Sequence, residues 1–118
     1  MIQEKLKILK ENNIIDNKTF DEMHEVLKYL KDKKVIDEGN LADTFITHLA
    51  MAVSREKSGE DQVDFVDESI KNEIIVLPEF KQAVQLWEEI SEFLTVDFPE
   101  AENDYFYLHL VTMLQSKD

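Results

Sequence analysis

Two histidines, His48 and His109, are the residues of this chain best suited to chemistry. Each stands in an apolar helical pattern and is followed by a leucine, in the segments Phe45–Ala52 and Tyr105–Val111. An imidazole held against an apolar face loses hydration and needs a hydrogen-bond partner. Two such rings in separate helices of a small chain therefore indicate a shared polar site.

Polar residues recur at helical spacing beside both histidines. Arg55 follows His48 by seven residues, on the same face to within about 20°, where its guanidinium could bind an anion near the ring. Glu102 and Tyr105 precede His109 by seven and four residues and share its face. A carboxylate can fix a histidine tautomer, and a tyrosine hydroxyl can donate to an oxyanion. If the two helices pack together, one pocket would hold all five side chains.

Each of these residues also has a purely structural interpretation. A histidine on an apolar face is often a satisfied core residue, and Arg55 could form a surface ion pair worth little. Tyr105 could belong to the core, and Glu102 could be an acid favoured by the dipole in the first turn of its helix. The third histidine, His24, stands among charged residues, so we expect it to be exposed and without a role.

Composition excludes several other chemistries. The chain has no cysteine and only two glycines, which excludes disulfides, thiol nucleophiles, zinc–thiolate sites and glycine-rich phosphate loops. Two histidines and a carboxylate could hold a divalent metal, which leaves a metal-dependent enzyme as one hypothesis. No compact His-Glu-x-x-His motif is present, so we expect no metal, no cofactor and no enzymatic activity.

The charge of the chain limits its partners. It has 118 residues, a formal net charge of −13 and 43% hydrophobic residues, as expected for one globular domain. Such a surface repels phosphate backbones and anionic lipids, so we expect no direct nucleic-acid contact, whereas a basic protein partner is plausible. The lysine run at 28–34 reads as a solvated helix end.

The ends and the hydropathy of the chain predict its location. No apolar run is long enough to span a membrane, and the start lacks the apolar segment of a signal peptide. We therefore expect a cytoplasmic protein that does not associate with membranes.

Hydrophobic periodicity is helical nearly throughout. A short amphipathic helix should break near Asn12. The next helix should start at a capping box with Thr19 as its cap and Glu22 reaching back. Asn40 should cap a helix that stops at Ser58 and Gly59. Further along, we expect Asp64 to cap a helix with apolar residues 66, 70, 74 and 77, Pro78 to open a helix that carries residues 83–94, and Pro99 to precede the last helix.

These expectations define the fold class and the domain division. The prediction is an all-α, compact antiparallel bundle of five main helices plus a short N-terminal helix, because short connections favour antiparallel neighbours. Residues 1–16 would form a short helical extension, and residues 17–118 would form the bundle.

The histidine segments resemble those of a known family. Thr47–Arg55 with Gly59 shortly after, and Glu102–Leu110, are similar to the PTS regulation domain (PRD) of bacterial regulators controlled by the sugar phosphotransferase system (PTS). The stretches at 70–74 and 80–83 resemble its middle helices. The resemblance runs from about Thr19 to Leu114 and makes the chain a stand-alone, single-domain member.

The resemblance implies a five-helix bundle that often forms homodimers. It also implies that His48 and His109 accept phosphoryl groups from the PTS phosphocarrier protein HPr or from a sugar-specific PTS component. From their spacing, we expect Arg55, Glu102 and Tyr105 to bind or orient the phosphate. Such phosphorylation shifts dimer packing and regulates transcription through an attached effector. Family members usually carry paired PRDs and a nucleic-acid-binding module, which this acidic chain lacks, so it could act in trans on another regulator.

Two functions remain open from the sequence. One is a regulatory module that senses PTS activity by phosphorylation on histidine and signals through protein contacts. The other is a helical interaction or dimerisation protein in which both histidines are structural.

Overall fold

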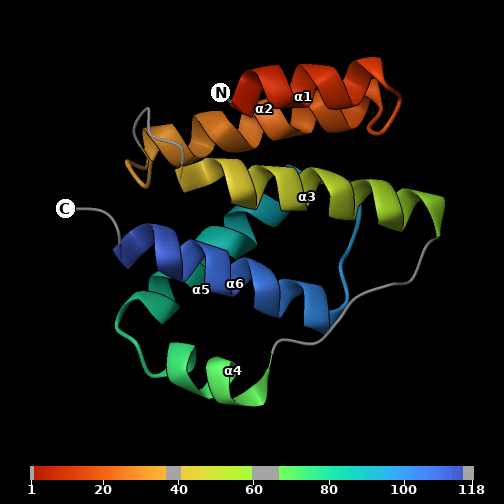
Figure 1. Ribbon diagram of the computed structural model, residues 1–118. Helices are drawn as coiled ribbons and strands as arrows, with labels where there is room; N and C mark the ends of the chain where they lie inside the picture. Colours follow the sequence, from red (N-terminus) through yellow and green to blue (C-terminus); the bar gives the residue numbers. More distant parts are fainter. Residues whose placement is uncertain (1, 37–40, 60–66, 116–118) are drawn as a thin grey trace. The chain divides into compact units, whose positions relative to one another are not determined.

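The computed structural model describes residues 2–36, 41–59 and 67–115 and divides the chain into two compact units, residues 1–61 and 62–118. Figure 1 shows helices and no strand in the described residues. The all-α prediction is thus confirmed, with six helices. Their bounds are α1 Ile2–Glu11, α2 Asn17–Asp32, α3 Leu41–Ser58, α4 Glu68–Ile75, α5 Glu79–Ser91 and α6 Glu100–Gln115.

The first unit is a three-helix assembly in which α1, α2 and α3 all pack on one another. In Figure 1, α2 runs antiparallel to both α1 and α3. The buried apolar side chains of the first unit recur at the helical period of the sequence. Core residues less than a tenth exposed are Leu6, Ile15, Met23, Val26, Leu27, Leu30, Val35, Ile36, Ala42, Phe45, Ile46, Leu49, Ala50, Ala52 and Val53.

The turn between α1 and α2 lies where the sequence places it. α1 ends at Glu11, and Asn13 adopts a left-handed conformation with φ 61°, which asparagine tolerates better than most residues. The cap of α2 differs from the prediction, because Asp16 is the N-cap and Thr19 lies three residues inside the helix. The Asp16 carboxylate accepts the backbone N–H of Thr19 at 2.7 Å. In the predicted capping box, the Glu22 side chain would have accepted this N–H. An aspartate at the N-cap accepts it instead.

Three contacts bind the end of α3 to this turn. The Ser54 hydroxyl donates to the carbonyl of Ile14 at 2.8 Å. The Lys57 ammonium lies 3.2 Å from a carboxylate oxygen of Asp16 and 3.0 Å from the Thr19 hydroxyl. These bonds connect residues about forty positions apart. They hold the C-terminal end of α3 against the turn between α1 and α2.

α3 ends as predicted, at Ser58, and is followed by Gly59 with φ 78°. A left-handed residue after a helix terminates it, and glycine adopts this conformation without strain. The predicted cap Asn40 lies outside the described residues. Near the start of α3, Asp43 pairs with Lys5 of α1 at 3.6 Å.

The second unit packs α5 against α6, with α4 in contact with both. α4 begins at Glu68 with Asp67 as its N-cap, whose carboxylate accepts the Ser69 N–H at 2.9 Å. The predicted cap Asp64 and the apolar position Val66 lie outside the described residues. The segment at 73–75 is helical, as expected, but α4 ends at Ile75, so the prediction that this helix would carry Leu77 is wrong.

Prolines mark the next two helix starts. Pro78 directly precedes α5 and Pro99 directly precedes α6, as the sequence predicts. α5 ends at Ser91, so the prediction that it would carry Phe93 and Leu94 is wrong. Both side chains are half-buried in the turns that follow the helix.

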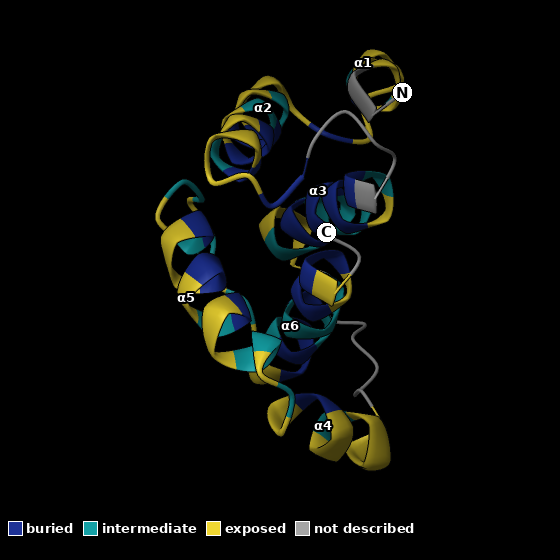
Figure 2. Cartoon of the chain, turned by 90° about the vertical axis from the view of Figure 1, so that its left-hand side faces the viewer, coloured by how far each residue is buried: buried dark blue, intermediate teal, exposed yellow. Residues whose placement is uncertain are grey.

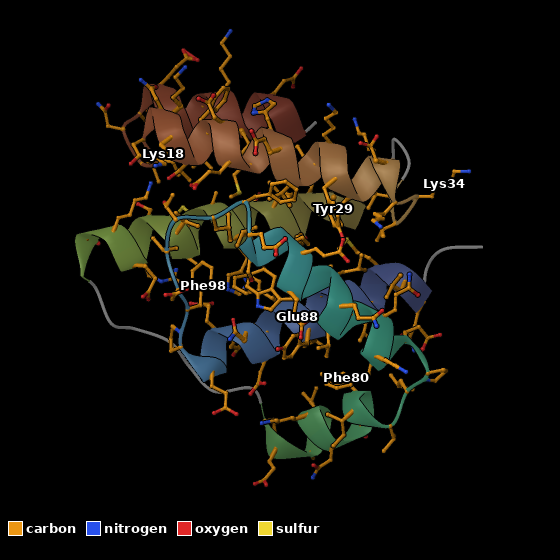
Figure 3. The ribbon with its side chains drawn as sticks, turned by 180° about the vertical axis from the view of Figure 1, so that it is seen from behind. Lys18, Tyr29, Lys34, Phe80, Glu88 and Phe98 are labelled. Carbon is orange, nitrogen blue, oxygen red and sulfur yellow. The ribbon has the colours of Figure 1, made fainter. Side chains whose placement is uncertain are left out.

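Aromatic rings join α5 to α6. The single tryptophan, Trp87, stacks on Phe106 with ring centroids 4.5 Å apart, and Phe98 lies against both rings. Aromatic pairs of this kind add stability beyond their buried area. At the other end of α5, Phe80 meets the edge of Tyr107 at 5.7 Å. Figure 3 labels Phe80 at the start of α5 and Phe98 in the segment before α6.

Burial is concentrated in α3 and α6 (Figure 2). From Ala42 to Glu56 every residue except Thr44 is buried or half-buried, and so is every residue from Ala101 to Val111. α4 is the opposite case, because Ile74 is its one buried residue. No helix among the described residues is long and apolar enough to cross a membrane.

Asp16 should contribute to stability in a pH-dependent way. The Thr19 backbone N–H, the Thr19 hydroxyl and Lys57 lower the pKa of Asp16 from 3.8 to about 2. Because the folded-state pKa lies below the unfolded value, the contribution is present above about pH 4 and is lost as the pH falls toward 2. Replacing Asp16 by alanine should lower the free energy of unfolding at pH 7 by about 0.5–2 kcal/mol.

Chemical denaturation of Asp16→Ala at pH 7 and at pH 2.5 measures this effect. Asp21→Ala is the matched control, because Asp21 is an exposed acid of the same helix. Equal losses for the two variants at pH 7 would contradict the role of Asp16 as the cap.

Candidate functional site

His48 and Arg55 lie on one continuous helix. Both are half-buried on α3, where the residues between them are helical without a break. Their spacing of seven residues puts them on the same face. The continuous helix therefore allows the predicted alignment of the His48 imidazole with the Arg55 guanidinium along one stripe.

Polar contacts join α3 to α1, α2 and the turn between them through Asp43, Ser54 and Lys57. At 100° per residue, these three positions lie about 120–180° around the helix from His48. Phe45 and Ala52 are fully buried and lie about 60° and 40° from His48. Apolar burial therefore borders the histidine stripe.

Thr47 adds a polar group that the sequence did not single out. Its side-chain oxygen is buried and has no hydrogen-bond partner among the described residues. A buried hydroxyl in this state costs free energy, so a group that reached it would be stabilised. No pattern in the sequence distinguishes Thr47 from an ordinary helical threonine.

His109 stands in a second stripe, on α6, with Glu102 and Tyr105. Glu102 is 1% exposed, and both Tyr105 and His109 are half-buried. The helix is continuous from Glu100 to Gln115, so the spacings of four and seven residues place the three side chains on one face. A carboxylate this deeply buried needs compensating partners.

The other sides of α6 are occupied by its own unit. The indole N–H of Trp87 on α5 donates to the Asn103 side-chain oxygen at 2.9 Å. On the α4 side, Lys71 pairs with Asp104 at 3.3 Å. Asn103 and Asp104 lie about 120–140° around the helix from His109. These two polar contacts lie apart from the second stripe, whereas Phe106, which stacks on Trp87, lies about 60° from His109.

Acidic residues shape the electrostatics around Tyr107. Burial, together with the nearby charges of Asp104, Glu88 and Glu100, raises the pKa of Tyr107 above its usual value of 10.0. Burial and the negative environment both disfavour the phenolate form of Tyr107.

The two units differ strongly in charge. Residues 1–61 carry 13 acidic and 10 basic side chains, a formal charge of −3, whereas residues 62–118 carry 13 acidic and three basic ones, a charge of −10. His48 belongs to the first unit and His109 to the second. The two histidines therefore stand in electrostatic surroundings of very different strength.

The predicted site residues thus form two groups. His48 and Arg55 share a face of α3, and His109, Glu102 and Tyr105 share a face of α6. The groups belong to different units, and the pocket that would join them stays a prediction. Among the described residues, no group of three or more His, Cys, Asp or Glu side chains could hold a metal ion.

His24 differs from its prediction. It is half-buried rather than exposed, stacks against Phe20 and makes a hydrogen bond with the Phe20 carbonyl. Only the position of Phe20 four residues earlier could have indicated this contact from the sequence.

The bond between Trp87 and Asn103 should be important for the second unit. Replacing Asn103 by alanine leaves the indole N–H of a residue only 4% exposed without its acceptor. We expect the free energy of unfolding to fall by about 1–3 kcal/mol. Denaturation followed by Trp87 fluorescence measures it, with Asn72→Ala on the exposed face of α4 as control. A loss no larger than that of the control would contradict the assigned bond.

Comparison with known proteins supports one family. The family model of the PRD domain matches residues 21–112, well over half of the chain, and this range includes both histidine stripes. Neither the curated proteins nor the solved structures gave a significant match. PRD domains are regulatory modules of the sugar phosphotransferase system rather than enzymes. The chain therefore belongs to the PRD family.

Proposed function

We propose that this chain senses PTS activity by accepting phosphoryl groups on His48 and His109 and passes the signal on through protein contacts. One observation carries the proposal. Each histidine lies half-buried on a continuous helix, in line with charged or polar side chains at helical spacing. Family membership supplies the phosphoryl chemistry.

The reaction needs only a neutral imidazole and a phosphorylated donor. A ring nitrogen with a free lone pair attacks the phosphorus of a donor phosphohistidine. The P–N bond of the donor breaks as the new P–N bond forms, and the donor imidazole recovers its electron pair. HPr or a sugar-specific PTS component is the donor we expect.

Arg55 offsets the charge that phosphorylation brings. A phosphoryl group adds roughly 1.5–2 negative charges at neutral pH, and the chain already carries −13. A guanidinium on the same face as His48 can bind two phosphoryl oxygens at once. The second unit has three basic residues in all and none on α6, so we expect His48 to be the faster acceptor.

Glu102 and Tyr105 take the orienting roles beside His109. A buried carboxylate in line with an imidazole can hold the N–H of one nitrogen and leave the other with its lone pair. The phenol of Tyr105, four residues before His109, can donate to a phosphoryl oxygen. These roles position the ring and the phosphate and involve no covalent step.

The signal would pass through protein surfaces. A phosphate placed on a largely buried helix face changes which contacts that face can make. We propose that this alters a homodimer or the contact with a separate regulator protein in the cytoplasm. The net charge of −13 opposes direct binding of nucleic acid.

Phosphate transfer from phosphoenolpyruvate through enzyme I and HPr tests the proposal. The wild type should acquire acid-labile phosphate, mapped by mass spectrometry, first at His48 and more slowly at His109. His48→Ala and His109→Ala should each lose their own site only. No label on either histidine, with HPr and every sugar-specific component supplied, would contradict the proposal and favour an interaction protein with structural histidines.

Arg55 can be tested separately from folding. Arg55→Gln should slow labelling of His48 by about tenfold, because the loss of about 1.4 kcal/mol of transition-state stabilisation has this effect. Arg55→Lys should recover part of the rate that Arg55→Gln loses.

Lys34→Gln is the control for Arg55→Gln. It removes the same charge from the first unit at an exposed position at the end of α2; Figure 3 labels Lys34 there. If it slowed labelling of His48 as much as Arg55→Gln, general charge rather than Arg55 would be responsible.

A further inference from the structure

The ring of His24 is held in one tautomer. Its Nδ1 atom lies 2.9 Å from the backbone carbonyl oxygen of Phe20, one helical turn earlier on α2. A carbonyl oxygen only accepts, so Nδ1 must carry the hydrogen and donate it. In the neutral ring the lone pair then lies on Nε2, the nitrogen away from the backbone.

Packing fixes the same ring from the side. The imidazole lies against the Phe20 ring, with centroids 4.5 Å apart and planes 56° apart. The ammonium of Lys10, on α1, lies 4.5 Å from the centroid of the Phe20 ring. A cation over an aromatic face is attracted by the ring quadrupole. His24, Phe20 and Lys10 thus form one ordered cluster across α1 and α2.

Two further cations extend this cluster along α2. Lys28 and Lys31 follow His24 by four and seven residues, so they share its face, and both are exposed. Lys10, on α1, lies over the Phe20 ring that packs against this imidazole. Asp21, three residues before His24, borders the same face, and Glu25 lies about 100° around the helix. The three lysines outnumber these two acids beside the ring.

This local charge is unusual for the chain. The whole second unit, at −10, contains as many basic residues as this one cluster. An anion that approaches the molecule is repelled by most of its surface and attracted here. Positive charge of this kind favours a nucleophile that must receive a doubly negative phosphoryl group.

We propose that Nε2 of His24 is a third phosphoryl acceptor, one that uses an N-phosphoryl donor. The Nε2 lone pair attacks phosphorus, the P–N bond of the donor breaks, and the donor nitrogen keeps the electron pair. The Nδ1 proton stays in its bond to the Phe20 carbonyl, and Lys28 and Lys31 hold the new phosphate oxygens. This acceptor site rests on neither His48 nor His109.

The tautomer itself is measurable. Long-range proton–nitrogen correlation spectra of ¹⁵N-labelled protein at pH 8 should assign the ring proton of His24 to Nδ1. A predominant Nε2–H form would overturn the proposal, since that nitrogen would then have no lone pair to offer.

The transfer is tested in the variant His48→Ala/His109→Ala, treated either with phosphoramidate or with phosphorylated HPr. We expect acid-labile phosphate on His24 with at least one of these two reagents. Labelling by phosphoramidate indicates a small-molecule donor, and labelling by phosphorylated HPr indicates a protein donor. Adding His24→Ala should abolish the label. Absence of phosphate on His24 in both arms would overturn the proposal, whatever the wild type shows at the other two histidines.

A matched pair of lysine variants tests the cation cluster. In the same background, Lys28→Gln should lower the initial rate at His24 severalfold. Lys18→Gln removes the same charge from an exposed position of α2 about 120° around the helix (Figure 3), and it should leave the rate nearly unchanged. Equal rates for the two variants would contradict the role of the cluster.

Discussion

The cost of removing polar groups from water is the constraint on which the rest of this structure depends. α3 and α6 are covered almost all round over their central residues, yet they carry His48, Arg55, Glu102 and His109. Burying such groups is unfavourable unless each has a partner. The apolar positions on the same helices provide the stability that allows this polar content.

Each unit meets the constraint by fixing its helices with polar bonds on one side. In the first unit, Lys57 and Ser54 tie α3 to the turn between α1 and α2. In the second, Asn103 and Asp104 tie α6 to α5 and α4. The histidine stripes lie on the same two helices, at least 120° around the axis from these polar bonds.

Features encoded within one turn of helix could be predicted from the sequence. Gly59 and Pro99 lie at the helix ends where they are expected, and the segments that carry the two stripes are continuous helices, α3 and α6. The cap of α2 was predicted wrongly because Asp16 and Thr19 are both good caps, and Lys57, 41 residues away, favours Asp16. The cluster around His24 includes Lys10 from another helix. Hydrophobic periodicity within one helix does not predict such a contact.

PRD membership and the two stripes together explain why a strongly acidic chain would keep imidazoles on covered helices. The most direct measurement is a ³¹P NMR spectrum of the wild-type protein after reaction with phosphoenolpyruvate, enzyme I and HPr. The account predicts phosphoramidate resonances that disappear on acid treatment and that belong to imidazoles of this chain. A spectrum that holds only phosphorylated HPr and inorganic phosphate, with the sugar-specific donors also supplied, would contradict it.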